Sequence, residues 1–149
     1  MAKKFNFRLD KVLTLKTQKV QELKEALNLI VMSRIAKENE IDKNQKYLNN
    51  LLKSKKGVLP ASSLQTSWSH KTYIQDTIKK LKIEREQLIE IENLRRQKLV
   101  EAMKEEKILL KLKDKKQTQY KEELSKEEVK ILDEIANNKF INNTDSKYL

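Results

Sequence analysis

The sequence has almost none of the residues that make turns, since its 149 residues include one glycine and one proline. Barrels, sandwiches and doubly wound sheets need many turns, and those turns depend on residues that tolerate positive φ. The near absence of such residues excludes all-β and α/β folds. About half of the residues are Ala, Glu, Lys, Leu or Arg, a composition typical of long helices and coiled coils.

Cysteine is absent, and aromatic residues make up 5% of the chain. Without cysteine there is no disulfide, thiolate nucleophile or thiolate metal site. The longest apolar run, residues 29–32, is far shorter than the ~18 residues that cross a bilayer. The basic N-terminus is followed by no apolar segment of the kind found in a secretory signal. We therefore expect a soluble chain that stays in the compartment where it is made.

The single glycine and the single proline stand close together, at Gly57 and Pro60. Gly57 can end a helix in the left-handed conformation, and the residue before a proline is kept out of helical space. Ser62 followed by Gln65 has the form of a capping box that restarts a helix. The sequence thus predicts a single domain over residues 1–149, with a helix at 5–54, a turn at 55–62, a helix at 63–137 and a frayed tail at 138–149.

Apolar residues in the first predicted helix recur with the 3-4 alternation of a left-handed coiled coil. They are Leu9, Leu13, Val20, Leu23, Leu27, Ile30, Ile41, Leu48 and Leu51, and the polar members of the series are Asn6, Lys16, Arg34, Lys37 and Asn44. The stripe of the second helix is looser and comprises Ile74, Ile78, Leu81, Leu88, Leu99, Ala102 and Leu109, followed after a shift by Leu110, Tyr120, Leu124, Ile131 and Ile135.

Two long helices joined by a short loop pack antiparallel. We therefore predict an all-α fold, a long antiparallel two-helix coiled-coil hairpin. Folding back at the turn places Leu9 opposite the region of Leu109, so that the longer second helix ends in an overhanging C-terminal helix. The apolar stripe of that overhang needs a partner to cover it, or else the segment frays.

Residues that could perform catalysis are missing. One glycine cannot form a phosphate-binding loop, and His70 is interpreted as a surface histidine beside Trp68. The adjacent pairs Glu105/Glu106 and Glu122/Glu123 point ~100° apart on a helix and are interpreted as a solvated face. We expect no catalytic, cofactor-binding or metal-binding residues and no cofactor. The sequence indicates a non-enzyme.

The net charge of +11 is uneven, because residues 1–60 carry +8 and the remainder carries +3. A basic arm is attracted to an acidic surface, whether nucleic acid, lipid or protein. Nucleic acid is not the expected partner, because acidic residues are mixed throughout the second helix and the aromatics are too scattered for base stacking. Lipid binding is an accessory possibility for the N-terminal residues Lys3, Lys4, Phe5, Phe7, Arg8 and Leu9.

The opening KKFNFRLDKVLTLKTQKVQELKEAL combines a basic, Phe-containing stretch with Leu-x-x-Val-Leu-x-Leu-Lys at residues 9–16. The second arm contains Tyr-Ile-Gln at 73–75, Glu-Ala-Met-Lys-Glu-Glu-Lys at 101–107 and Leu-Asp-Glu-Ile-Ala at 132–136. In this order, around a single turn, these motifs resemble the FliJ family of the bacterial flagellar export apparatus. The resemblance spans nearly the whole chain.

The resemblance implies an antiparallel hairpin similar to the stalk of rotary ATP synthases. It implies that the free ends insert into the hexameric flagellar export ATPase and that the chain contacts the cytoplasmic domain of the export gate and other export chaperones. The implied location is cytoplasmic, peripheral at the inner membrane. A dedicated chaperone for export substrates is the alternative within secretion, and a coiled coil that binds DNA or lipid is the alternative outside it.

The resemblance also implies two sets of contact residues. In the family, exposed and often aromatic residues near the turn bind the export gate, and Tyr47 and Tyr73 match that pattern. Packing under the turn is their alternative role. Lys43 and Lys80 stand where relatives carry an aromatic or small residue. The expected contacts with the ATPase are Phe5, Phe7, Arg8, Leu9, Leu124 and Ile131.

Overall fold

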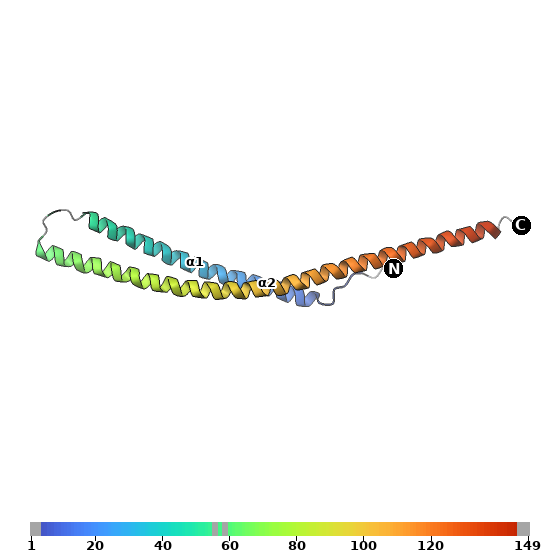
Figure 1. The fold of residues 1–149 in the computed structure, drawn as a ribbon, viewed down its shortest axis with the longest axis horizontal. Helices are drawn as coiled ribbons and strands as arrows, with labels where there is room; N and C mark the ends of the chain where they lie inside the picture. The colour runs from blue at the N-terminus through green and yellow to red at the C-terminus, as the bar shows by residue number, and fades with distance from the viewer. Residues whose placement is uncertain (1–3, 55–56, 58–59, 146–149) are drawn as a thin grey trace. The chain divides into compact units, whose positions relative to one another are not determined.

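The computed structural model describes residues 4–54, 57 and 60–145. Two helices, α1 (Asp10–Ser54) and α2 (Ala61–Asp145), contain nearly all of these residues. No strand occurs in the part of the chain that is described. The predicted all-α class is confirmed, since α1 and α2 pack against each other as a helical hairpin (Figure 1).

The chain divides into two compact units. Unit 1 comprises Met1–Thr17 and Lys104–Leu149, and unit 2 comprises Gln18–Met103. Both helices contribute residues to both units. The hairpin turn belongs to unit 2, whereas the two ends of the chain belong to unit 1.

In unit 2, α1 and α2 bury an apolar stripe between them. Ile41 of α1 packs with Ile74, Ile78 and Leu81 of α2, and Leu48 and Leu51 of α1 pack against this cluster. The four cluster members are 4–8% exposed, as is expected where the apolar faces of two helices meet and leave water. All six residues belong to the two predicted stripes, the 3-4 series of the first helix and the looser stripe of the second, so the periodicity identified this buried face correctly.

Helix α1 begins at Asp10, so the predicted start at residue 5 is wrong. The backbone N–H of Asp10 donates to the Phe7 carbonyl (3.0 Å), and that of Leu13 donates to the Leu9 carbonyl (2.9 Å). Residues 4–7 are not helical, and this path leaves Phe7 only 8% exposed. Burial of the phenyl ring stabilises the path, and the Asp10 carboxylate favours a helix N-terminus at that point.

Helix α2 begins at Ala61, directly after Pro60, and not at residue 63. The fixed φ of proline suits a helix start, and the Pro60 carbonyl accepts a hydrogen bond from the Leu64 N–H (3.1 Å). Ser62 lies inside the helix, where its carbonyl accepts a hydrogen bond from Thr66 Oγ1 (3.0 Å), so the predicted capping box does not start the helix.

Gly57, in the predicted turn, has a φ of 157°, which is positive but far from the left-handed helical value of about 57°. Residues 55, 56, 58 and 59 of the predicted turn lie outside the described residues.

Helix α2 continues to Asp145, past the predicted end at residue 137. Asparagine lowers helix propensity by well under 1 kcal/mol per residue, and residues 138–145 contain no glycine or proline. The sequence therefore contains nothing strong enough to end the helix at 137. The last four residues of the predicted tail, 146–149, lie outside the described part of the chain.

Candidate functional site

Two surfaces contain the residues that the sequence singled out, and the first lies near the hairpin turn in unit 2. Tyr47 of α1 and His70 of α2 are joined by a hydrogen bond of 3.0 Å between the Tyr47 hydroxyl and His70 Nε2. Their rings meet edge to face, with centroids 5.7 Å apart and planes at 84°. This contact holds the Tyr47 ring across the two helices while leaving Tyr47 49% exposed.

Tyr73 stands one helical turn after His70 and so shares its face of α2. It is 69% exposed, which argues against the alternative role of packing under the turn. Tyr47 and Tyr73 thus lie on either side of His70 on one exposed surface. Interpreting His70 as a surface histidine was correct about its exposure but missed its contact with Tyr47.

Lysines flank this surface. Lys46 pairs with Asp42 one turn earlier, with 2.7 Å between Nζ and Oδ2, and the hydrogen bond to this carboxylate raises the pKa of Lys46 above its ordinary value. Lys43 and Lys80 are exposed. The aromatic surface is therefore bordered by positive charge.

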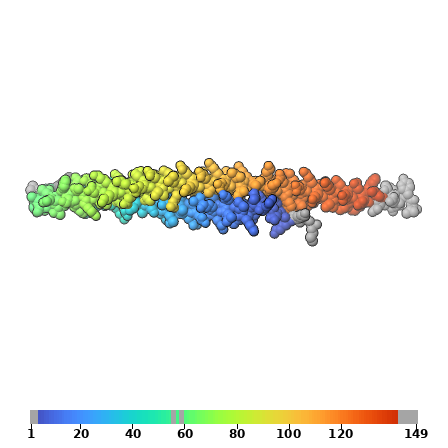
Figure 2. Space-filling view, turned by 90° about the horizontal axis from the view of Figure 1, so that it is seen from below, coloured from blue at the N-terminus to red at the C-terminus, as the bar shows by residue number. Residues whose placement is uncertain are grey.

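The second surface is a groove in unit 1 with a volume of about 1050 Å³. The non-helical start of the chain forms one side of it, and α2 forms the other. The Phe5 ring meets the Tyr120 ring at 5.6 Å between centroids, with planes tilted by 46°. Figure 2 shows the N-terminal residues, in blue, against the orange part of α2.

The groove brings together five of the six residues predicted to contact the ATPase. Phe5, Phe7, Arg8, Leu9 and Leu124 line it, along with Lys4, Asn6, Leu112, Lys116, Gln119, Tyr120, Glu123 and Glu127. The sixth, Ile131, does not line the groove, stands two turns beyond Leu124 and is 55% exposed. The groove thus has an apolar floor with charges of both signs around it.

The covered part of α2 in unit 1 is longer than expected, because α1 begins at Asp10 and not at the predicted residue 5. The Asp10 carboxylate pairs with Lys113 at 2.8 Å, about one turn beyond the predicted partner region at Leu109. Residues 4–7 then run beside α2 in a non-helical path, which covers about twice the length per residue that a helix would. Tyr120 and Leu124, expected in the overhang, are therefore half-buried.

The carboxylates of Glu105 and Glu106 reach across to α1 and are not simply solvated, as the sequence suggested. Glu105 pairs with Lys16 at 2.5 Å, and Glu106 accepts a hydrogen bond from the Thr17 hydroxyl at 2.9 Å. These contacts fix the start of α1 on α2. Adjacent acids point in different directions, as expected, but each finds its own partner on the facing helix.

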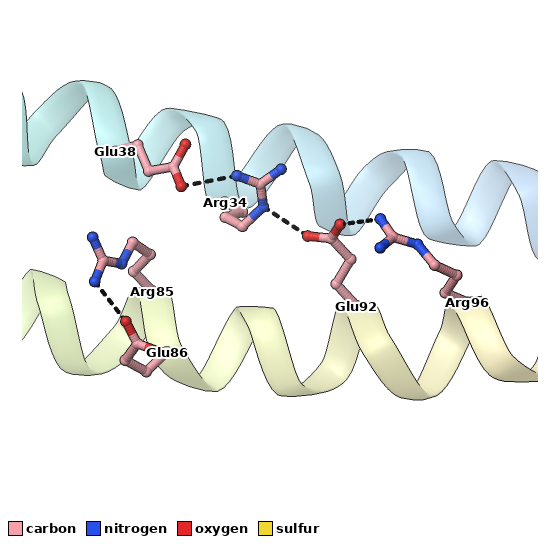
Figure 3. Close-up of polar contacts among 6 residues, drawn as sticks. All are labelled: Arg34, Glu38, Arg85, Glu86, Glu92 and Arg96. Carbon is pink, nitrogen blue, oxygen red and sulfur yellow. Dashed lines mark hydrogen bonds and ion pairs between the residues drawn. The ribbon is translucent and has the colours of Figure 1, made fainter.

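A carboxylate, Glu92, lies in the seam of unit 2 and is 6% exposed. It accepts hydrogen bonds from Arg34 of α1 and Arg96 of α2, each at 2.6 Å (Figure 3). Arg34 also pairs with Glu38 at 2.8 Å. The two carboxylates, Glu92 first, raise the pKa of Arg34. Two guanidinium groups offset the cost of burying this carboxylate, and the network ties α1 to α2 at one point.

The described residues offer no constellation for catalysis or metal binding. No group of three His, Asp or Glu side chains among them could hold a metal ion. The carboxylates of the ion pairs face Lys or Arg, an arrangement that stabilises helices and positions no nucleophile or base. Within these residues, neither α1 nor α2 has a stretch that is long and apolar enough to cross a membrane.

Comparisons with known proteins identify the class to which this helical hairpin belongs. The family model described as "Flagellar FliJ protein" matches residues 5–145. The comparison with curated proteins and the comparison with solved structures each found no match.

The match covers nearly the whole chain, so this protein belongs to the FliJ family. The family is a component of the flagellar export apparatus. The protein is therefore assigned to flagellar biogenesis and protein export.

Proposed function

We propose that this protein is a stalk, coupling and chaperone component of flagellar protein export. It binds the hexameric export ATPase through the groove of unit 1 and the cytoplasmic domain of the export gate through the aromatic surface of unit 2. Membership of the FliJ family supports the system, and the two surfaces support the division of contacts. Such a protein works in the cytoplasm, peripheral to the inner membrane.

The observation that carries the ATPase contact is the gathering of five predicted residues around one groove. The α2 segment next to it adds Val129, Ile131 and Ile135, which are 47–55% exposed. Ile131 and Ile135 stand one turn apart on the same face, and apolar side chains exposed on one face of a helix mark a protein-contact surface. A sleeve formed by the ATPase hexamer supplies the apolar contacts that this segment of α2 needs.

Binding to the export ATPase tests this contact. Removal of residues 120–149 is expected to abolish co-purification with the ATPase and stimulation of its turnover. The finer variant Leu124→Asp/Ile131→Asp is expected to do the same while the far-ultraviolet circular dichroism stays helical, because neither residue is fully buried. The matched control, Leu29→Asp/Leu94→Asp, changes two exposed leucines of unit 2 and is expected to bind normally. Normal ATPase binding by both the truncated chain and Leu124→Asp/Ile131→Asp would contradict the proposal.

The gate contact rests on Tyr47 and Tyr73, which flank His70 on one exposed surface. Exposed tyrosines are common anchors of protein interfaces, because a rigid ring brings a large contact area at low entropic cost. Tyr47→Ala/Tyr73→Ala is expected to weaken binding of the gate domain by tenfold or more, which is about 1.4 kcal/mol. Binding of the ATPase is expected to be unchanged. If gate binding survives the double substitution, this assignment is wrong.

The chaperone role is separable from the stalk role. A dedicated chaperone is expected to bind filament-type export substrates and to leave the ATPase unstimulated, whereas the proposed protein binds the ATPase and also escorts other export chaperones. Titration of the protein with duplex DNA tests the nucleic-acid alternative. Binding to DNA with a steep salt dependence would favour that alternative.

A further inference from the structure

The hairpin end of unit 2 is free of negative side chains. Between Asp42 and Asp76 the sequence contains no Asp or Glu. Four described lysines, Lys43, Lys46, Lys53 and Lys71, lie in this interval. Lys46 is paired with Asp42, but Lys43, Lys53 and Lys71 pair with no carboxylate of the described residues. This end of unit 2 therefore presents uncompensated positive charge.

Large apolar side chains are exposed at the same end. Leu52 of α1 is 52% exposed, Leu64 of α2 is 52% exposed and Trp68 is 69% exposed. Because Tyr47 contacts His70 in this antiparallel pair, Leu52 lies level with the turn of α2 that holds Leu64 and Trp68. At about 1.5 Å per residue, Trp68 is ~10 Å from the start of α2. An apolar cap and its basic border thus lie within a short distance of the hairpin end.

The chemistry of this end suits an anionic lipid surface better than a specific acidic protein site. Its described cations are all lysines, which act as point charges, whereas bidentate recognition of a carboxylate favours arginine. A hollow there, of about 470 Å³, is lined by Ser62, Ser63, Thr66, Ser67 and His70, and thus by no aliphatic side chain and by no aromatic ring other than the imidazole. Tryptophan is the side chain that prefers the membrane–water interface, where apolar residues enter about 5–10 Å.

We propose that the hairpin end of unit 2 binds the surface of a bilayer that contains anionic phospholipids. Trp68, Leu52 and Leu64 enter the interface between headgroups and acyl chains, and Lys43, Lys53 and Lys71 interact with the lipid phosphates. The inference rests on charge and exposure at this end and does not depend on the proposed contacts with the ATPase or the gate. It assigns to α1 and α2 a peripheral attachment that requires no spanning segment.

Trp68 is the only tryptophan of the chain, so its fluorescence reports this contact directly. The full-length protein is titrated with vesicles of phosphatidylcholine alone and of phosphatidylcholine with about one third phosphatidylglycerol. We expect sedimentation with the anionic vesicles only, a blue shift of the Trp68 emission, and quenching by lipids brominated near the headgroup. Raising the salt from about 50 mM to about 500 mM is expected to release most of the protein.

Matched substitutions distinguish binding through the hairpin end from attraction by the net positive charge of the whole protein. Lys43→Gln/Lys53→Gln/Lys71→Gln is expected to weaken vesicle binding about 10-fold to 100-fold, since each lysine near the surface adds to the attraction. The control Lys98→Gln/Lys107→Gln/Lys111→Gln removes the same charge from exposed positions elsewhere and is expected to bind as the parent does. Leu52→Ser/Leu64→Ser is expected to reduce the blue shift, and its control Leu29→Ser/Leu94→Ser is not.

Three outcomes would overturn the proposal. One is no sedimentation and no shift of Trp68 emission with anionic vesicles at low salt. The second is an equal loss of binding in the two lysine triples, which would mean attraction by total charge alone. The third is that Lys43→Gln/Lys53→Gln/Lys71→Gln binds vesicles as the parent does but no longer binds an acidic protein such as the gate domain. That result would identify a protein, and not a lipid surface, as the partner of the hairpin end. Circular dichroism of each variant verifies that the helices are intact.

Discussion

Helix α2 carries the same kind of apolar residue in two very different environments. In unit 2, Ile74 and Ile78 are 4% and 7% exposed, because α1 lies against them. In unit 1, Ile131 and Leu132 are 55% and 64% exposed. The hydrophobic residue is similar in both places, and only the facing helix differs. An apolar stripe on a helix therefore predicts that a surface is needed, but not whether the same chain supplies it.

Charge separates the two regions as well. Residues 43–75 at the hairpin end contain no acid, whereas residues 121–145 contain seven acids and four lysines. Residues 43–75 are therefore positively charged, whereas residues 121–145 carry a net negative charge. Substitutions at matched positions in the two regions test how far this contrast extends.

The largest expected effect is at Ile78, in the buried cluster. Ile78→Asp is expected to lower the free energy of unfolding by about 3–4 kcal/mol, because the carboxylate must leave water or part the helices. Ile131→Asp makes the same chemical change at an exposed site and is expected to change it by less than about 0.5 kcal/mol. Urea titration followed by circular dichroism measures both. Equal effects would show that the described burial is absent in solution.

A smaller effect is expected at Phe7, in unit 1. Phe7→Ala is expected to cost about 1–2 kcal/mol, below the usual value for a core phenylalanine, because residues 4–7 can leave the surface of α2. The loss is expected to be local. Hydrogen exchange should speed up at the amides of Asp10 and Leu13 and stay unchanged at Ile41. Faster exchange throughout α1 would mean that unit 1 holds the rest of the helix in place.

Glu92→Gln is expected to have a smaller effect than Phe7→Ala, but one that is specific to the seam. The amide still accepts hydrogen bonds, yet Arg34 and Arg96 lose the carboxylate that both of them contact. The melting temperature is therefore expected to fall, whereas the control Glu90→Gln, at an exposed position of α2, is expected to leave it unchanged. If the two variants melt together, the network contributes nothing to the stability of unit 2.

The smallest expected effect appears at alkaline pH. Lys37 lies between Glu84 and Glu40, and these carboxylates, Glu84 first, raise its pKa above the ordinary value of 10.5. A raised pKa in the folded chain means that this ion pair stabilises fully at neutral pH and is lost as pH rises through that pKa, above about 10.5. Lys37→Met is therefore expected to lose less stability than the parent between neutral pH and about pH 11. Thermal melts across this range compare the two chains.

The fold was largely predictable, because a 3-4 stripe and a single pair of helix breakers leave few alternatives. Ile41 and Ile74 were placed on the buried face by periodicity alone. The start of α1 could not be found that way, since Leu9 and Leu13 continue the pattern without a break. Only the three-dimensional fit of Phe7 beside α2 shows that the chain leaves the helix there.

The candidate sites were only partly predictable. The residues that line the groove come from the two ends of the chain, but the predicted register left Leu124 in the overhang. Only the non-helical path of residues 4–7 brings Phe5 to the same groove as Leu124. Glu92 was missed, although it continues the spacing from Leu88 towards Leu99, because a carboxylate is rarely placed in a seam. The contact of His70 with Tyr47 was also within reach, since folding back at Gly57 brings these two positions level.

The Glu92 contacts have a mechanical consequence. If α2 were to slide along α1 by one heptad, Arg34 would meet either Arg85 or Leu99 in place of Glu92. The first shift sets two guanidinium groups against each other, and the second leaves Arg34 facing an aliphatic side chain, with Glu38 of its own helix as its remaining acceptor. Sliding of α2 along α1 in unit 2 is therefore opposed, because a shift of one heptad breaks the contacts of Glu92 with Arg34 and gives Arg34 a less favourable neighbour.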